Sequence, residues 1–324
     1  MNLENFLKLG REAAVNYDLK NQFRHQLYAG EFEELTSLDE WSIYKAKSNK
    51  LKIDCDVSKL SVDVAHKLYN KNLNLQSTVH KQSGNHYKFE LVTKKHGVIR
   101  IDTMNSMWTV LKQVIQMNHR GKMGKLNQSY FDMCESLEIN INKGLAGQVD
   151  KLVGKYDEII DHKQLLNLLN EFAQITHSIG NLLLYPATEH SINFNINRGI
   201  KKEIQDYFDL TLVAIKEWYL ERDKENPLQK VLNENKAWFG MFGKGLAGWR
   251  NYVELNYLEE FTEGSDYKPI LFWEDHSFEN PSIEKHLQTY LNKSELEARL
   301  IQFLTFVNHA IRKRGERIYN VLIS

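Results

Sequence analysis

The fold class of this chain is decided by residues 198–222, which read RGIKKEIQDYFDLTLVAIKEWYLER. Apolar side chains recur there at intervals of three and four residues, at Ile200, Ile204, Phe208, Leu212, Ile215 and Tyr219. This spacing places them on one side of a helix, because an α-helix completes a turn every 3.6 residues. We therefore predict one long amphipathic helix over 198–222, at the centre of a mainly helical fold.

Helix is also the default expectation for most of the remaining chain, since its first 185 residues contain no proline. Residues 3–17 predict a first helix, and residues 104–119 predict another. Ser294 and Glu297 have the spacing of a reciprocal capping pair, which predicts a final helix from there through Ile318. An aromatic-rich stretch is predicted to be core; it holds Trp238, Phe239, Phe242 and Trp249.

A different pattern occupies residues 50–102, where apolar and polar residues alternate over short runs, as in strands. The runs are LKIDC at 51–55, HYKFELV at 86–92 and VIRI at 98–101. The predicted class is mainly α (α+β). Two lobes are predicted. The N-terminal lobe, residues 1–125, is α+β and holds a small antiparallel sheet, and the second lobe, residues 126–324, is helical.

Composition argues against several classes of protein. The two cysteines, Cys55 and Cys134, are too few for a disulfide scaffold or a thiolate zinc site. The opening residues MNLENF lack the basic start of a signal peptide, and nowhere do about 18 apolar residues run together. We therefore expect a cytoplasmic protein without a membrane partner.

Formal charge is balanced, with 42 basic and 42 acidic residues, but it is unevenly distributed. Residues 94–125 carry a net charge of +6, and residues 251–280 carry −7. The basic run predicts a surface that contacts a nucleic-acid backbone, and a solvated face without function is the alternative. The binding residues proposed from this run are Lys94, Lys95, Arg100, Arg120, Lys122 and Lys125.

A polar stretch between two predicted helices is the main candidate site. It comprises THSIGNLLLYP at 176–186 and NFNINRG at 193–199. Loops held by rigid elements often carry binding residues. The candidates are His177, Asn181, Asn193, Asn197 and Arg198. The alternative is structural: a helix ends at Gly180, and the asparagines bond to turn backbone.

The segments HSIGN, YP, NRG and YFDLTL, which begin at residues 177, 185, 197 and 207, resemble the central signature of an uncharacterised bacterial domain family. The stretches 238–253 and 312–318 are similar to the C-terminal pattern of that family, so the resemblance covers roughly the C-terminal half. It implies a fold but no activity. Asp209 lies within the signature and is included among the binding candidates.

A second resemblance points to chemistry. The run IGNLLL at 179–184 is similar to the Gly-Asn-Leu segment of His-Asn-His nuclease domains in some modification-dependent restriction enzymes. That resemblance implies catalysis by His177, Asn181 and His162, with a divalent metal beside the scissile phosphate. The sequence identifies no ligands for such a metal. It also departs from that family, because residues 164–174 are predicted to be helical where a strand and loop are needed.

Two hypotheses follow. The first is a helical effector or binding protein of a bacterial or phage-conflict (defence) system, which contacts nucleic acid or a protein partner through its basic N-terminal surface and basic C-terminal helix. The second is a metal-dependent His-Asn-His-like nuclease. The sequence establishes no cofactor and no oligomeric state. The nuclease depends on the stretch 176–199 opening onto solvent.

Overall fold

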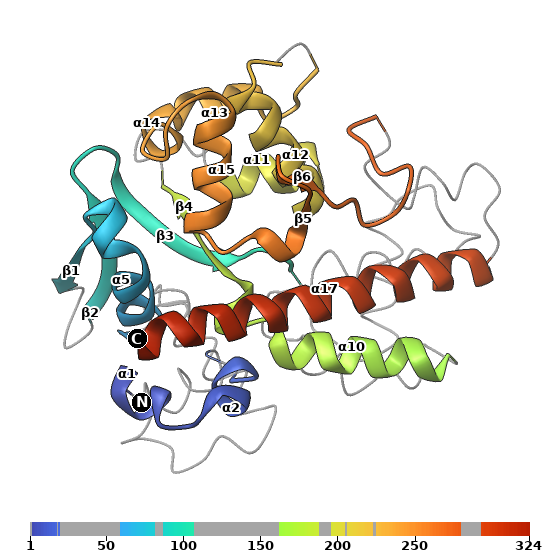
Figure 1. Cartoon of the computed structure of the whole chain (residues 1–324), viewed down its shortest axis with the longest axis horizontal. Coiled ribbons are helices and arrows are strands. Elements are labelled where there is room, and N and C mark those ends of the chain that lie inside the picture. The colour runs from blue at the N-terminus through green and yellow to red at the C-terminus, as the bar shows by residue number, and fades with distance from the viewer. Residues whose placement is uncertain are drawn as a thin grey trace.

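The computed structural model describes residues 2–17, 19, 59–81, 87–106, 162–187, 196–204, 206–222, 225–279 and 293–324. A four-stranded antiparallel sheet and the 31-residue helix α17 (Lys293–Ile323) organise this part of the chain. Figure 1 shows α17 running beneath the sheet and the smaller helices. The predicted class, mainly helical with a small antiparallel sheet near the N-terminus, is confirmed.

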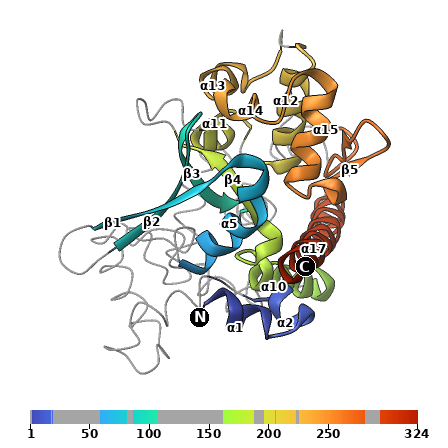
Figure 2. The ribbon, with the colours of Figure 1, turned by 60° about the vertical axis from the view of Figure 1, so that its left-hand side comes forward.

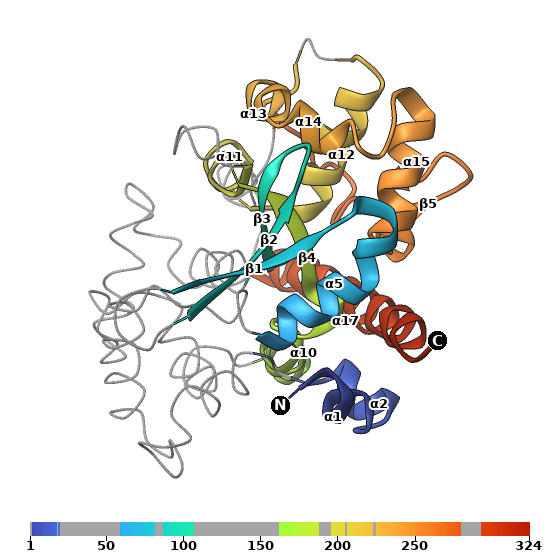
Figure 3. The same cartoon turned by 90° about the vertical axis from the view of Figure 1, so that its left-hand side faces the viewer.

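The sheet contains β1 (Gln76–Lys81), β2 (Tyr87–Thr93), β3 (Gly97–Thr103) and β4 (Leu182–Pro186), in that spatial order. Helix α5 (Lys59–Leu73) packs on one face and contacts the first three strands (Figure 3). Paired residues of an antiparallel ladder share a face of the sheet. The pairing of Leu91 with Ile99, and of Ile101 with Leu184, therefore gives the sheet one apolar face.

Strand β4 comes from the second half of the sequence and pairs with β3 from the first half, with Thr103 opposite Leu182 and Ile99 opposite Pro186. The two lobes predicted at 1–125 and 126–324 therefore share one sheet. The proposed boundary between them lies outside the described residues. The sheet and α17 are joined through α5, which contacts both.

Two of the three predicted strands are confirmed, since 86–92 corresponds to β2 and 98–101 to β3. The third, LKIDC at 51–55, lies outside the described residues. Strands β1 and β4 were not predicted. The run LLLYP of β4 shows no apolar–polar alternation because four of its five residues are buried, which removes the period-two signal.

Helix α10 (Lys163–Ile175) lies alongside α17 (Figures 1 and 2). The apolar face of α17 carries the buried residues Leu300, Leu304, Val307, Ile311 and Ile318. The predicted C-terminal helix is therefore confirmed. Two short helices, α1 (Leu3–Leu7) and α2 (Arg11–Val15), also contact α17.

The single helix predicted over 3–17 is wrong, because α1 and α2 are separated at Gly10. That residue adopts φ +82°, which ends one helix and turns the chain into the next. The hydroxyl of Tyr319 on α17 donates to the Leu7 carbonyl oxygen at 2.9 Å and fixes the corner.

The remaining helices form a cluster above the sheet and α17 (Figure 1). They are α11 (Ile196–Glu203), α12 (Phe208–Tyr219), α13 (Gln229–Glu234), α14 (Lys236–Phe239) and α15 (Gly245–Leu255). After α15 come the short elements η7 (Glu259–Phe261), β5 (Thr262–Glu263) and β6 (Lys268–Pro269). The four aromatic residues of 238–249 predicted to be core are all buried here.

The long helix predicted over 198–222 is also corrected, since it is divided between α11 and α12 at Asp206. Asp206 has φ +68°, a left-handed conformation that interrupts a helix. Its amide donates to the Ile200 carbonyl oxygen at 3.0 Å, and its carboxylate accepts a hydrogen bond from the Ser106 hydroxyl at 2.5 Å. A tertiary contact with Ser106, which follows β3, therefore stabilises a break that apolar periodicity does not reveal.

The HSIGN segment follows α10 and forms the 3-10 turn η5 (Ile179–Asn181), which packs on α17. A Cβ atom at Gly180 would stand 2.0 Å from the Ile311 carbonyl oxygen and 3.0 Å from the Gly315 nitrogen. Only glycine therefore permits this approach of two backbones. The Arg314 guanidinium is buried beside it, where Nη1 donates to the Gly180 carbonyl oxygen at 2.8 Å and Nε to that of Asn256 at 3.0 Å.

We predict that Gly180→Ala lowers the free energy of unfolding by about 3 kcal/mol or more, because the added methyl group overlaps helix backbone that has no free space. Gly264→Ala is the control, since a Cβ there meets nothing within 4 Å and only its positive φ carries a cost, about 1–2 kcal/mol. Chemical denaturation of both variants measures the difference. Equal losses would contradict the steric explanation.

Candidate functional site

The three residues proposed for a nuclease site are not brought together. His162 precedes α10 and His177 follows it, so about 20 Å of helix separates them. Nδ1 of His162 accepts a hydrogen bond from the Leu165 amide at 3.3 Å, which caps the helix. His177 is half-buried, and its carbonyl oxygen accepts from the Leu19 amide.

Asn181 is fully buried, and its side chain bonds to the main chain on both sides. Its Nδ2 donates to the carbonyl oxygens of Asn105 at 2.8 Å and Thr176 at 2.7 Å, and its Oδ1 accepts from the Asn105 amide at 3.1 Å. These bonds join the end of α10 to the residues that follow β3. The amide group is therefore occupied by structural contacts, and the geometry gives the nuclease hypothesis no support.

The remaining candidates of the polar stretch are placed only in part. Asn197 and Arg198 lie in α11 rather than in the predicted loop. Asn193 lies outside the described residues, as do Arg120, Lys122 and Lys125 of the basic run.

Asp209 is buried in the helical cluster and faces a residue that the sequence analysis did not select. Its Oδ2 lies 2.5 Å from Nδ1 of His276 and accepts from the Phe272 amide at 2.9 Å. Sequence reasoning would place His276 at the surface, because Glu274 and Asp275 precede it. The aromatic residues that flank this acidic pair, Phe272–Trp273 and Phe278, were the signal for burial.

The described part of the basic run lies on the β2–β3 hairpin. Lys94 and Lys95 occupy its turn and are exposed, and neither has an ion-pair partner among the described residues. Arg100 is exposed on β3. His96 holds the turn in place. Its amide donates to Thr93 Oγ1 at 3.0 Å, and its ring packs edge-on against the buried Trp238 of α14, with ring centroids 6.4 Å apart. Lys236, exposed on α14, lies two residues before that tryptophan.

The basic residues near the C-terminal end of α17 are already engaged within the chain. Arg312 pairs with Glu171 at 3.0 Å, and Lys313 pairs with Glu316 at 3.0 Å. Arg317 bridges Glu259 and Glu260 at 2.9 and 3.0 Å. Other residues of the acidic run are also paired, since Asp266 binds Arg250, Glu263 binds Lys268 and Asp275 binds Arg299. Opposite charges in the C-terminal half thus neutralise one another.

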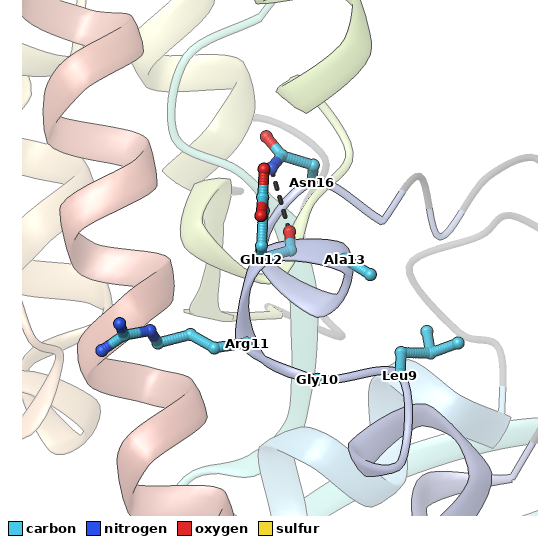
Figure 4. A pocket seen from close by; sticks show the side chains of 6 residues that line it. All are labelled: Leu9, Gly10, Arg11, Glu12, Ala13 and Asn16. Carbon is cyan, nitrogen blue, oxygen red and sulfur yellow. Dashed lines mark hydrogen bonds between the residues drawn. The ribbon is translucent and has the colours of Figure 1, made fainter.

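An open hollow of about 510 Å³ lies at the corner between α1 and α2 (Figure 4). It is lined by Leu9, Gly10, Arg11, Glu12, Ala13 and Asn16. The Asn16 side chain donates back to the Glu12 carbonyl oxygen at 2.9 Å, within α2 itself. The figure shows the Arg11 and Leu9 side chains pointing away from each other, so charged and polar groups do not converge there.

The described residues contain neither a cluster of metal-binding side chains nor a membrane-spanning helix. No group of three or more His, Cys, Asp or Glu side chains gathers there in a way that would hold a metal ion. No helix in the same residues has the length and apolar character needed to cross a bilayer.

We predict that Asn181→Ala lowers the free energy of unfolding by about 2 kcal/mol, because it leaves buried carbonyl and amide groups without partners. Asn167→Ala, on the exposed side of α10, should change stability by less than about 0.5 kcal/mol. Thermal or chemical unfolding measures both. An unchanged stability in Asn181→Ala would refute the structural role.

The docking of the hairpin turn should depend on pH. Burial lowers the pKa of His96 more than its hydrogen bond with the main chain of Ala187 raises it. The unfolded chain therefore binds a proton near pH 6.5, where the folded chain does not, so stability is lost as pH falls below about 6.5. NMR titration of the imidazole and unfolding at several pH values test this. His96→Gln should remove this part of the pH dependence, and an imidazole that titrates at its ordinary value would contradict the prediction.

Comparisons with known proteins agree with part of the sequence analysis. Residues 144–318, more than half of the chain, match a family described as a family of unknown function, DUF6994. The signature segments at 177–181, 197–199 and 207–212 all lie within that range. No curated protein and no solved structure matches the chain, and the resemblance to His-Asn-His nucleases has no support in these comparisons. The chain belongs to the DUF6994 family of unknown function.

Proposed function

We propose that this protein binds nucleic acid through the basic turn, which we define as Lys94 and Lys95 in the turn of the β2–β3 hairpin. The observation that carries the proposal is that Lys94 and Lys95 are exposed and lack ion-pair partners in the described part of the chain. The basic residues near the C-terminal end of α17 are instead paired or buried. Of the two basic regions predicted to contact a partner, the turn is therefore the one available.

Lysines on a rigid turn suit phosphate recognition. Each ammonium group that neutralises a phosphate releases condensed counterions, and this release drives binding to nucleic acids. The contact of His96 with Trp238 holds the turn against the helical cluster before any ligand arrives. Less conformational entropy is then lost on binding.

The chemistry of this surface favours the backbone over the bases. Lysine is a flexible point charge, well matched to phosphate oxygens, whereas base recognition uses bidentate or stacking side chains. Trp238, the aromatic residue beside the turn, is buried and is not available for stacking on a base. We therefore propose binding with little sequence preference.

The biological setting belongs to the same proposal. The family resemblance suggests a bacterial protein, and we propose that it acts as an effector in defence against phage. Phage plating on cells with and without the gene tests this setting. Equal plating across a broad phage panel would remove the defence role and leave the binding proposal intact.

We predict that the double variant Lys94→Glu, Lys95→Glu weakens binding to a labelled oligonucleotide by about tenfold or more. The fall of log affinity with log salt should also become shallower, by a slope of about one for each lysine. Fluorescence anisotropy at several salt concentrations measures both quantities. A matched control reverses Arg11 and Lys163, which are exposed on α2 and α10 without ion-pair partners among the described residues, and should leave binding unchanged. Equal losses in both variants, or no salt-dependent binding by the native protein, would overturn the proposal.

A further inference from the structure

The segment of residues 270–279, which we call the strap, crosses the helical cluster after β6 and is held mainly by side chains. Its backbone hydrogen bonds to other described residues run from the Ile270 amide to Phe261 at 3.0 Å and from the His276 amide to Trp273 at 3.1 Å. A segment with so few backbone bonds depends on its side-chain anchors to remain in place.

One carboxylate supplies the central anchor. Oδ2 of Asp209 accepts a hydrogen bond from the Phe272 amide at 2.9 Å and lies 2.5 Å from Nδ1 of His276. Because a carboxylate is an acceptor, Nδ1 carries the proton of this bond. The side chains of Asp209 and His276 are both fully buried. Asp209 belongs to α12, so a single residue of the helical cluster fastens two points of the strap.

Aromatic rings form the underside of the strap. Phe272 packs on Phe303 of α17, with ring centroids 4.6 Å apart, and Trp273 packs edge-on against Tyr207 at 5.4 Å. The ring of His276 packs against the same tyrosine, with ring centroids 4.7 Å apart, and against Trp273, with centroids 3.7 Å apart. The closed strap therefore covers an aromatic floor made by Tyr207, just before α12, and Phe303 of α17.

The closed arrangement nevertheless leaves polar atoms unsatisfied. Oδ1 of Asp209, Nε2 of His276 and Nε1 of Trp273 are buried and have no hydrogen-bond partner among the described residues. They belong to side chains that contact one another directly. Unpaired buried polar atoms favour any state that hydrates them, because water supplies the missing partners. The aromatic contacts hold the strap down, and these three atoms favour its release.

We propose that the strap is a latch, fastened by Asp209, which opens as a unit while the rest of the chain stays folded and thereby uncovers the aromatic floor. The inference is independent of the basic turn, which lies on the β2–β3 hairpin. The failure of either proposal therefore leaves the other untouched.

Native-state hydrogen exchange of the full chain, in low and graded denaturant, tests the latch without any substitution. The strap amides should exchange through a local opening, so their exchange rate should depend little on denaturant. They should also exchange at least about tenfold faster than the amides of α12, α15 and the buried part of α17. Exchange of the strap at the same rate as those helices, with the same dependence on denaturant, would overturn the proposal.

Two variants then test the anchor. Asp209→Asn should speed strap exchange by about tenfold or more, because the charged acceptor is lost, and leave α15 and α17 unchanged. Asp275→Asn is the matched control, since it removes a carboxylate of the same strap that pairs with Arg299 at the surface. Equal effects in both variants overturn the assignment of Asp209. Acceleration of all helices together in Asp209→Asn would show that this residue is part of the common core rather than a latch.

Discussion

The contact between the turn η5 and helix α17 is the constraint on which the rest of the structure depends. Backbone meets backbone there, since a Cβ at Gly180 would lie 2.0 Å from the Ile311 carbonyl oxygen. Arg314 consolidates the contact with hydrogen bonds to carbonyl oxygens of η5 and of Asn256, at the end of α15. Burial lowers the pKa of this arginine, yet guanidinium groups stay charged in proteins, so several carbonyl dipoles stabilise one buried cation. Three segments distant in sequence are fixed by that requirement.

The polar residues that follow in the signature serve the same joint. Asn181 satisfies main-chain groups of Thr176, at the end of α10, and of Asn105, after β3. Ser106, the residue after Asn105, binds the carboxylate of Asp206. Buried backbone amides and carbonyls need partners wherever regular structure stops, and asparagine and aspartate side chains provide them. A cluster of histidine and asparagine that resembles a catalytic site can therefore arise from the needs of a buried junction. In this chain, Asn181 illustrates that case.

Some charged side chains form ion pairs within the chain, whereas others remain exposed to solvent. The acidic run and the basic residues of α17 neutralise one another across the C-terminal half, as the bridging of Glu259 and Glu260 by Arg317 illustrates. Lys94 and Lys95 are left at the tip of a hairpin, without ion-pair partners in the described residues. Net charge alone, which is zero, conceals both arrangements. The pairing of charges in space, rather than their number, distinguishes a surface that is open to a ligand from one that is not.

Local periodicity in the sequence by itself determined the mainly helical class, the C-terminal helix, strands β2 and β3 and the aromatic core, because each of these follows from side-chain spacing along a few turns or residues. The exposed lysines of the basic run were also predictable, since a hairpin turn faces solvent. Only the tertiary structure decided the break at Asp206, the membership of β4 in the sheet, and the burial of Asn181 and His276. Each of these depends on a partner distant in sequence: Ser106, β3, Asn105 and Asp209. A one-dimensional pattern does not encode such contacts, because hydrogen bonding and close packing between distant segments depend on how the helices are placed in three dimensions.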